Sequence, residues 1–169
     1  MSQMEILQAK PDDLIEILFL IRQCVKDMNL KGMKHWNSSY PGTEDISKDL
    51  SNEAIYLVKD KGICLGMVTI NEVQPDDYKD IKWSDNNSKV LYMKRMAVHP
   101  YWQGKGIGKM LVEFTEEYGK KNDYSSIRLD TLSSNQAETK LYTGSEFDEV
   151  GNFYSTFQKT PFKCYEKKI

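Results

Sequence analysis

Three glycines alternate with other residues in one short stretch of the chain: Gly104, Gly106 and Gly108. Lys105 and Lys109 lie among them. Glycine lets a backbone approach a ligand closely and adopt positive φ, and the lysines supply positive charge. Between residues 94 and 109 there are four basic side chains and no acidic one. We therefore expect this loop to bind an anion.

The residues after the glycines predict an amphipathic helix, because Ile107, Leu111 and Phe114 fall on one helical stripe. The start of a helix presents backbone N–H groups and a partial positive charge, which suit a pyrophosphate. A tight turn with solvated lysines fits the same residues equally well. The loop alone leaves both interpretations open.

Two well-known phosphate-binding loops do not fit this stretch. A Walker A loop requires Gly-Lys followed by Ser or Thr, whereas Gly108-Lys109 is followed by Met110. A dinucleotide fingerprint requires a third glycine where this chain has Lys109. A phosphate held here would therefore be held by a different kind of loop.

The elements that position this loop follow from hydrophobic periodicity and turn signals. Strands are predicted over residues 2–8, 54–59, 63–70, 90–98, 126–130, 147–150 and 160–167. Helices are predicted over residues 11–28 and 44–50, directly after the glycine loop, and after Asn135, which can form a capping box with Glu138. The polar residues 73–88 are expected to form one long surface loop.

The order of these elements, β α α β β β α β α β β, indicates a fold of the α/β (α+β) class. The strand–loop–helix–strand unit in the middle implies a right-handed crossover between parallel strands. On either side the strands can pair as antiparallel hairpins, such as the one that turns at residues 60–62. A mixed, twisted, mostly antiparallel sheet flanked by helices satisfies both, and 169 residues suit a single domain over 1–169.

Composition argues against several classes of protein. The net charge is −2, so no overall attraction to nucleic acid or to an anionic membrane is expected. The longest apolar run, Ile17 to Ile21, is too short to span a bilayer. The three cysteines, Cys24, Cys64 and Cys164, are interpreted as reduced core thiols of a cytoplasmic protein. A nucleophilic Cys–His pair is the alternative, and two histidines far apart predict no metal site.

The stretch RMAVHPYWQGKGIGKML places a hydrophobic strand before Val98, Pro100, Gln103, Gly106 and Gly108. It resembles the acetyl-CoA loop of the GNAT superfamily of N-acetyltransferases, in which Val-x-Pro is followed by Gln/Arg-x-x-Gly-x-Gly/Ala. A second family motif is matched by Asn135, Leu141, Tyr142 and Phe147. Both motifs occur in the family's order, and the order of elements also matches, so the resemblance extends over nearly the whole chain.

One position departs from the family pattern. The family's glycine before the phenylalanine is Glu146 here, and a glycine occurs earlier, as Gly144. That glycine normally ends the preceding helix in a left-handed conformation. Either Glu146 adopts this conformation, or the turn is rebuilt around Gly144.

The resemblance implies acetyl-CoA as co-substrate and no metal. In the family, a bulge splays the strand before the loop, and the pantetheine arm pairs with that strand. The implied binding residues are Met96, Ala97, Val98, Gln103, Gly104, Lys105, Gly106, Ile107, Gly108, Lys109 and Asn135. Backbone groups of Met96 and Val98 would hold the arm, and the amides of residues 104–109 would hold the pyrophosphate. Asn135 would approach the arm, or serve only as a helix cap.

The implied reaction is direct attack of a primary amine on the thioester in a ternary complex. The acceptor must lose a proton, and Asp130, at the end of a predicted strand, is the first candidate for the base. Glu72 and a water chain are alternatives for the base, and the alternative for Asp130 is a structural residue that binds the loop at residues 131–134. Tyr142 is the candidate donor to the departing sulfur, because a hydrogen bond stabilises a developing thiolate. The alternative for Tyr142 is a core tyrosine.

The acceptor itself stays open between a small amine, a peptide N-terminus and a lysine side chain. Five aromatic residues could line an amine site or simply pack: Trp36, Tyr40, Trp83, Tyr154 and Phe162. Two other functions remain as alternatives, a non-catalytic acyl-CoA-binding sensor on the same fold and a nucleotide-phosphate binder. A homodimer is a further possibility that the resemblance suggests.

Overall fold

The computed structural model describes residues 3–87, 89–156 and 158–169. Its Cα positions group into two compact units. Unit 1 comprises Met1–Ile70 and Arg95–Leu111, and unit 2 comprises Asn71–Lys94 and Val112–Ile169. The expectation of a single domain over 1–169 stays a prediction.

The elements occur in the predicted order. The strands are β1 (Met4–Gln8), β2 (Ile55–Asp60), β3 (Ile63–Asn71), β4 (Val90–Val98), β5 (Ser126–Leu132), β6 (Asp148–Phe153) and β7 (Phe162–Lys168). The helices are α1 (Leu14–Leu30), α2 (Thr43–Ser51), α3 (Ile107–Lys121) and α4 (Gln136–Gly144). Short 3₁₀ turns are η1 (Pro11–Asp13), η2 (Asp76–Tyr78) and η3 (Pro100–Trp102). Residue 2 of the first predicted strand and residue 88 of the predicted loop lie outside the described residues.

The described strands form one mixed sheet in the order β1-β2-β3-β4-β5-β7-β6. The pairs β1–β2, β2–β3, β5–β7 and β6–β7 are antiparallel. Strands β4 and β5 are parallel, with register pairs from Val90–Ser126 to Tyr92–Arg128. Farther along β4, Arg95 has a φ of 49°, which breaks regular strand geometry. The predicted fold class is therefore confirmed.

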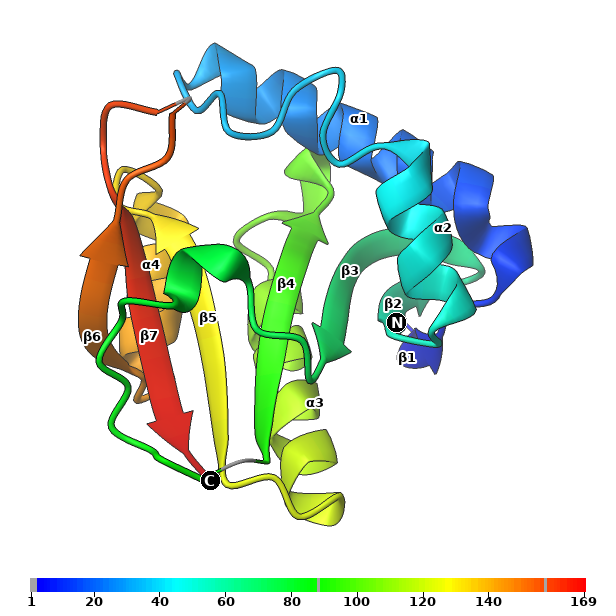
Figure 1. The fold of residues 1–169 in the computed structure, drawn as a ribbon. Coiled ribbons are helices and arrows are strands. Elements are labelled where there is room, and N and C mark those ends of the chain that lie inside the picture. The colour runs from blue at the N-terminus through cyan, green and yellow to red at the C-terminus, as the bar shows by residue number, and fades with distance from the viewer. Residues whose placement is uncertain (1–2, 88, 157) are drawn as a thin grey trace. The chain divides into compact units, whose positions relative to one another are not determined.

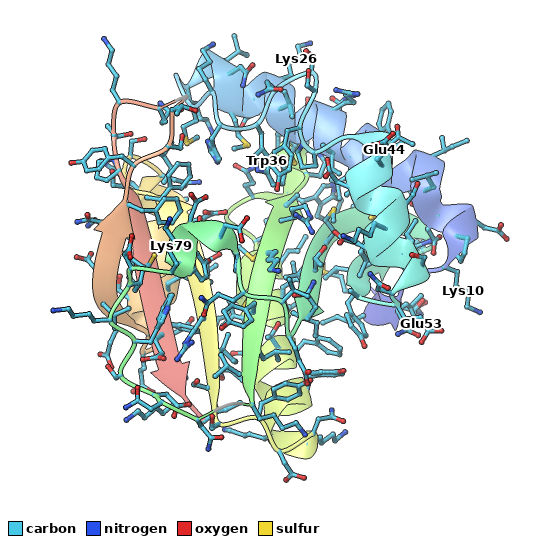
Figure 2. All side chains as sticks on the ribbon, viewed as in Figure 1. Lys10, Lys26, Trp36, Glu44, Glu53 and Lys79 are labelled. Atoms are coloured by element: carbon cyan, nitrogen blue, oxygen red, sulfur yellow. The ribbon has the colours of Figure 1, made fainter. Side chains whose placement is uncertain are left out.

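Unit 1 is organised around an apolar core beneath α1 and α2 (Figure 1). Ile17, Ile21 and Ile46 are fully buried there, because the apolar stripes of both helices face the strands. Figure 2 shows Trp36 turned inward below α1, whereas Lys26 and Glu44 point away from the core. The predicted hairpin between β2 and β3 turns through left-handed residues at positions 61 and 62.

Unit 2 holds β5, β7 and β6 side by side. Figure 1 shows η2 crossing in front of β5, with α4 on the other side of these strands. The prediction that residues 73–88 form a surface loop is wrong in one respect. Tyr78 on η2 is only 1% exposed and packs in a core cluster with Val90, Tyr92 and Cys164. Pro75 lies before this turn and fixes its entry, so the polar composition of the segment hid one buried residue.

The turn after α4 decides between the two expectations for its left-handed residue. Glu146 has a φ of 67°, and Gly144 is the last residue of α4. The amide of Phe147 donates to the carbonyl of Tyr142 (3.0 Å), which closes the end of the helix. Glu146 therefore occupies the conformation that the family's glycine would have, and the alternative of a turn rebuilt around Gly144 is wrong.

Candidate active site

The glycine loop of unit 1 has the backbone that an anion site requires. Gly104 and Gly106 have φ of 76° and 89°, and a Cβ built on either would have no heavy atom within 4 Å. Open space therefore adjoins both glycines. Helix α3 begins directly after them, and its first internal hydrogen bond runs from the Met110 amide to the Gly106 carbonyl (3.0 Å). The amides of Ile107 and Gly108 precede that bond, so they suit an external acceptor.

Close packing fixes the loop within unit 1. A Cβ on Gly66 of β3 would lie 2.8 Å from Cγ2 of Ile107 and 3.2 Å from the carbonyl oxygen of Ala97. Only glycine lets β3, the end of β4 and the start of α3 approach this closely. The side-chain amide of Gln103 donates to the Val98 carbonyl (3.1 Å), which also accepts from the thiol of Cys24 (3.3 Å). The end of β4 is therefore tied to the start of the loop.

The lysines of the loop keep a local positive charge. Lys105 Nζ lies 4.7 Å from the centre of the Trp102 ring, and Lys109 is exposed. His99 is a structural residue here, since its ring nitrogen accepts from the Tyr101 amide (3.1 Å) and caps η3. The residues present fit a pyrophosphate, with glycine backbone close to the ligand and cations at the rim.

Asp130, the candidate base, lies in unit 2 on β5. Its carboxylate accepts a hydrogen bond from the Tyr78 hydroxyl (2.6 Å). Burial raises the pKa of Asp130 to about 6, and the hydrogen bond from Tyr78 opposes that rise. The negative charge of Asp77 adds to the rise, and the positive charge of Lys94 opposes it. A carboxyl group with this pKa can accept and release a proton near neutral pH.

Asn135 and Glu138 form half of the predicted capping box. The Asn135 side chain accepts from the Glu138 amide (3.2 Å), as a helix cap does. The Glu138 carboxylate instead accepts from the hydroxyl of Thr131 on β5. Burial raises the pKa of Glu138 to about 7, and the charge of Asp130 adds to the rise. Glu138 is therefore a second titratable acid in this part of unit 2.

Tyr142 lies one helical turn after Glu138 and is 3% exposed. Its ring packs against Phe147 and Tyr165, with centroid distances of 5.9 Å to each. Burial raises the pKa of Tyr142 well above its usual value, and the charges of Glu138 and Asp130 raise it further. The tyrosine therefore keeps its proton at neutral pH. Asp130 and Tyr142, predicted from separate stretches of sequence, are thus brought together.

Two members of this cluster were not predicted as site residues. Glu138 precedes Tyr142 by four positions, so the two share one helical face, and that spacing could have indicated it. Tyr78 gave no comparable signal, because it is a single aromatic residue in a polar segment far from Asp130 in sequence.

The Acetyltransferase (GNAT) family profile matches residues 21–147, three quarters of the chain. The chain belongs to the GNAT acetyltransferase family. The match includes the glycine loop, Asp130 and Tyr142, so this is a domain of the N-acetyltransferase type.

Known proteins resemble the chain in sequence or in fold. An N-acetylaspartate synthetase of Xenopus tropicalis is 29% identical over 136 residues, which cover 78% of this chain and 49% of that protein. The chain thus spans about half the length of this curated relative. A GNAT acetyltransferase of Streptococcus agalactiae superposes with a TM-score of 0.83 at 19% identity, over 100% of this chain and 98% of that one. The PaiA N-acetyltransferase of Thermoplasma acidophilum, solved with coenzyme A, gives 0.74 at 17% identity, over 99% of each chain.

The aromatic residues expected near the acceptor of this GNAT domain fall into two groups. Trp36 lies in the unit 1 core, Phe162 stacks on Phe153 at 5.1 Å, and Trp83 packs against Tyr78 at 5.1 Å. Tyr40 and Tyr154 are exposed. Trp36 and Phe162 are buried, whereas Trp83 is half-buried and Tyr40 and Tyr154 can meet a ligand without rearrangement. The alternative base Glu72 accepts a hydrogen bond from the Tyr124 hydroxyl (2.6 Å).

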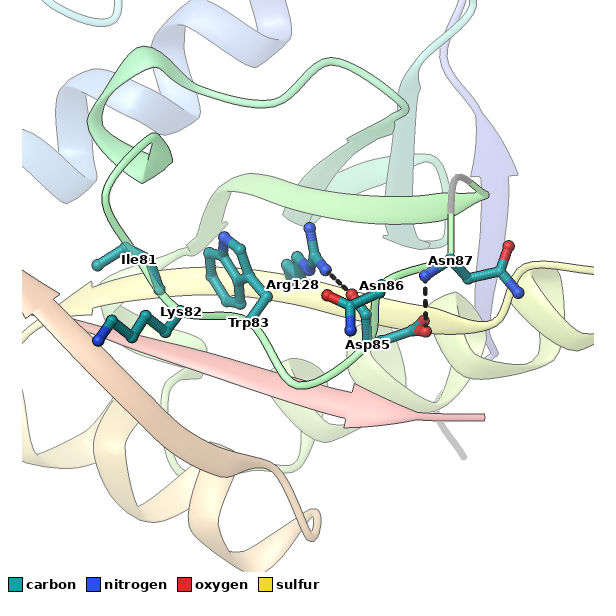
Figure 3. Close-up of a pocket in the computed structure, with 7 residues that line it drawn as sticks. All are labelled: Ile81, Lys82, Trp83, Asp85, Asn86, Asn87 and Arg128. Carbon is teal, nitrogen blue, oxygen red and sulfur yellow. Dashed lines mark hydrogen bonds between the residues drawn. The ribbon is translucent and has the colours of Figure 1, made fainter.

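Unit 2 of this GNAT domain also contains an open hollow of about 450 Å³ (Figure 3). Its lining residues are Ile81, Lys82, Trp83, Asp85, Asn86, Asn87 and Arg128. Arg128 does not offer its charge to a ligand there, because it pairs with Glu166 (2.9 Å) and donates to Tyr92 and to the Asp85 carbonyl. Trp83, one of the five aromatic candidates for the acceptor site, lines this hollow, whereas none of the candidate catalytic or acetyl-CoA-binding residues does.

The cysteines behave as the sequence predicts for core thiols. All three are buried and outside any disulfide. Burial raises the pKa of Cys64 and of Cys164 to about 12, which disfavours a nucleophilic thiolate at either position. Within the described ranges, no group of three or more His, Cys, Asp or Glu side chains could hold a metal ion. Nor does any helix there have the length and apolar character needed to cross a membrane.

Proposed function

We propose that this GNAT domain transfers the acetyl group of acetyl-CoA to a primary amine by direct attack in a ternary complex. The observation that carries the proposal is that unit 2 brings together Asp130 and Tyr142, a carboxyl group and a phenol whose pKa values are both raised and lie far apart. Asp130 has a pKa raised to about 6, and Tyr142 has one raised well above its usual value. Near neutral pH the carboxyl group can therefore accept a proton while the phenol keeps its own, and acid–base catalysis needs such a pair.

The glycine loop of unit 1 is proposed to bind the pyrophosphate of acetyl-CoA. The positive φ of Gly104 and Gly106, the open space beside them and the start of α3 support this role. Backbone groups of Met96, Ala97 and Val98 would pair with the pantetheine arm. Gln103 would act indirectly, because its side chain holds the Val98 carbonyl. For Asn135 the cap bond supports a structural role beside the proposed contact with the arm.

In the proposed chemical step, the amine nitrogen bonds to the thioester carbonyl carbon and the carbon–sulfur bond breaks. The amine gives up its proton to Asp130, directly or through water. An alkylammonium has a pKa near ~10.4, so this proton does not leave unaided at neutral pH. The raised pKa of Tyr142 makes full proton transfer to the departing thiolate unfavourable. Tyr142 would therefore stabilise the thiolate by donating a hydrogen bond.

The acceptor is proposed to be a small molecule or peptide that carries a primary amine. The name of the Xenopus relative identifies N-acetylaspartate as its product, so the amino group of aspartate is the first acceptor to test. Polyamines, other amino acids, a peptide with a free N-terminus and a lysine-containing peptide complete the panel.

The test measures thiol release from acetyl-CoA with each amine, and mass spectrometry of the acetylated product. We expect at least one amine to accelerate thiol release above the rate without amine. Binding of coenzyme A with no amine-dependent release would contradict the proposal and favour the acyl-CoA sensor. Competition by ATP as strong as that by coenzyme A would favour the nucleotide-phosphate binder.

A further inference from the structure

Arg95 adopts a left-handed backbone inside a regular strand. Its φ is 49°, and it lies six residues into the nine-residue strand β4. Among the described residues, the other left-handed residues that are not glycine are Glu53, Lys61, Asp123 and Glu146, all in turns or after helices. An L-residue in this conformation is strained, and such strain persists only where the surroundings enforce it.

The surroundings of Arg95 are a set of polar contacts within unit 1. Its guanidinium binds the Asp49 carboxylate through two nitrogens, Nε to Oδ2 at 2.8 Å and Nη2 to Oδ1 at 2.9 Å. Its third nitrogen donates to the Tyr40 hydroxyl at 3.1 Å. Asp49, on α2, is 5% exposed. A bidentate, shielded ion pair of this kind fixes both distance and orientation.

Asp49 is itself held in place. Its Oδ2 also accepts from the hydroxyl of Thr69 at 3.1 Å, and Thr69 on β3 is fully buried. The carboxylate therefore cannot follow Arg95 if the strand relaxes. Removing the Asp49 carboxylate, or the side chain of Arg95 itself, would free the backbone at residue 95 to return to extended geometry.

Residues 96–98, directly after Arg95, form the part of β4 that the proposed function assigns to acetyl-CoA binding. Because side chains and backbone groups alternate along a strand, a one-residue change of geometry turns each following residue to the other face. The Ala97 carbonyl and the Ile107 side chain both lie close to Gly66, so the orientation of residues 96–98 also bears on the packing around the start of α3. The backbone at Arg95 thus sets which groups Met96 and Val98 present.

We propose that Asp49 is a positioning residue for the acetyl-CoA site, acting through Arg95 to hold β4 in its left-handed break. The inference rests on the proposed function, because it assumes that residues 96–98 and the glycine loop bind coenzyme A. It assigns Asp49 no contact with the ligand.

The test compares Arg95→Gly with Arg95→Ala, since both remove the ion pair and only glycine adopts positive φ without strain. The measurement is the Kd of coenzyme A by calorimetry, with urea unfolding of each variant. We expect Arg95→Gly to bind nearly as tightly as the parent. Arg95→Ala should bind about tenfold more weakly, because the apparent Kd rises as the binding-competent fraction falls.

Lys61→Gly and Lys61→Ala form the matched control. Lys61 is left-handed at a φ of 50°, exposed, and in the turn between β2 and β3. Both variants should bind coenzyme A like the parent, although their stabilities differ. If Arg95 had a purely structural role, Arg95→Gly and Arg95→Ala would behave in the same way. Their stabilities would differ, and their folded fractions would bind coenzyme A with unchanged affinity.

Asp49→Asn provides a second route if Arg95→Ala does not fold. It should weaken coenzyme A binding in the parent background, and should have little effect in the Arg95→Gly background. Equal affinity of the Gly and Ala variants, or an equal effect of Asp49→Asn in both backgrounds, would overturn the inference. Failure of the parent protein to bind coenzyme A would instead contradict the proposed function, and the inference with it.

Discussion

The hydroxyl of Tyr142 is buried beside two carboxyl groups whose own pKa values are raised. Burial raises all three pKa values, the charge of Asp130 raises those of Glu138 and Tyr142 further, and the charge of Glu138 raises that of Tyr142, so the cluster retains protons that exposed carboxyl groups would lose. For a donor to a departing thiolate this is useful, because the hydroxyl is fully protonated when the substrate arrives. For the base Asp130 a raised pKa makes the carboxylate more basic but narrows the pH range in which it is ionised, so Asp130 becomes effective only above its pKa of about 6.

Replacing Tyr142 with Phe removes the proposed donor and keeps the ring that packs on Phe147 and Tyr165. We expect kcat to fall roughly 10²–10³-fold, the range for loss of a single donor to a developing anion. The contact forms in the transition state, so kcat/KM should fall with kcat. Steady-state kinetics with an accepted amine and a thermal melt of the same preparation measure both quantities.

Tyr165→Phe is the matched control for that variant, because it removes a hydroxyl from the adjoining buried ring. We expect it to alter stability more than turnover. Turnover of Tyr142→Phe within a few-fold of the parent would mean that water or another residue assists the thiolate.

The raised pKa of Asp130 predicts the pH dependence of the reaction. If Asp130 is the base, kcat/KM should rise with pH up to about 6 and then level off. Asp130→Asn should lose most of the activity and also the acidic limb of the profile. An acidic limb that persists in Asp130→Asn would assign the base to another group, such as Glu72.

The same shift has a consequence for stability that does not depend on catalysis. The pKa of Asp130 is raised from 3.8 to about 6, so the folded protein binds this proton more tightly than the unfolded chain. Its contribution to stability is present below about pH 4 and is lost as the pH rises through about 6. Asp130→Asn should therefore gain stability at pH 8 relative to pH 4.5, by of order 1 kcal/mol for this half-buried side chain.

At the level of elements, local signals were sufficient where one segment determines its own conformation. The apolar stripe of α3 and the turn at residues 60–62 were predicted because spacing and turn residues act locally. Tyr78 and Arg95 were not. Tyr78 donates a hydrogen bond to Asp130, and Arg95 pairs with Asp49, residues 52 and 46 positions away. No pattern within either segment carries that information.

The end of α4 allows a prediction about backbone conformation alone. Glu146 is exposed at a φ of 67°, so Glu146→Gly should stabilise the protein by about 1 kcal/mol. Gly144 ends the helix, and a Cβ there would have no heavy atom within 4 Å, so Gly144→Ala should add about 0.5–1 kcal/mol. Urea titration measures both changes.

Gly32→Ala supplies the opposite sign for comparison. Gly32 also has open space around a built Cβ, but its φ is 84°, so alanine there should destabilise by about 1 kcal/mol. We therefore expect Glu146→Gly and Gly144→Ala to raise the free energy of unfolding and Gly32→Ala to lower it. If Glu146→Gly gave no gain while Gly32→Ala destabilised the protein, the left-handed assignment of Glu146 would be wrong.

At the level of the whole molecule, ligand binding reports on both the site and the cooperativity of the chain. A ligand that binds only the folded state at one hundred times its Kd stabilises it by about 2.7 kcal/mol. For a chain of this length we expect coenzyme A to raise the melting temperature by roughly 5–10 °C. ATP at the same concentration should have a much smaller effect.

Gly106→Val tests whether that stabilisation comes from the glycine loop. Valine at a φ of 89° is strained and fills the open space that a pyrophosphate would use, so the rise in melting temperature caused by coenzyme A should largely disappear.

The melting curve of the parent protein also tests whether the chain unfolds as one unit. The loop lies in unit 1, whereas Asp130 and Tyr142 lie in unit 2. If the chain is one cooperative domain, as its length predicts, coenzyme A should shift a single transition as a whole. Two transitions, of which only one moves with coenzyme A, would show that the two units unfold separately. Unchanged stabilisation of folded Gly106→Val would place the coenzyme A site elsewhere on the protein.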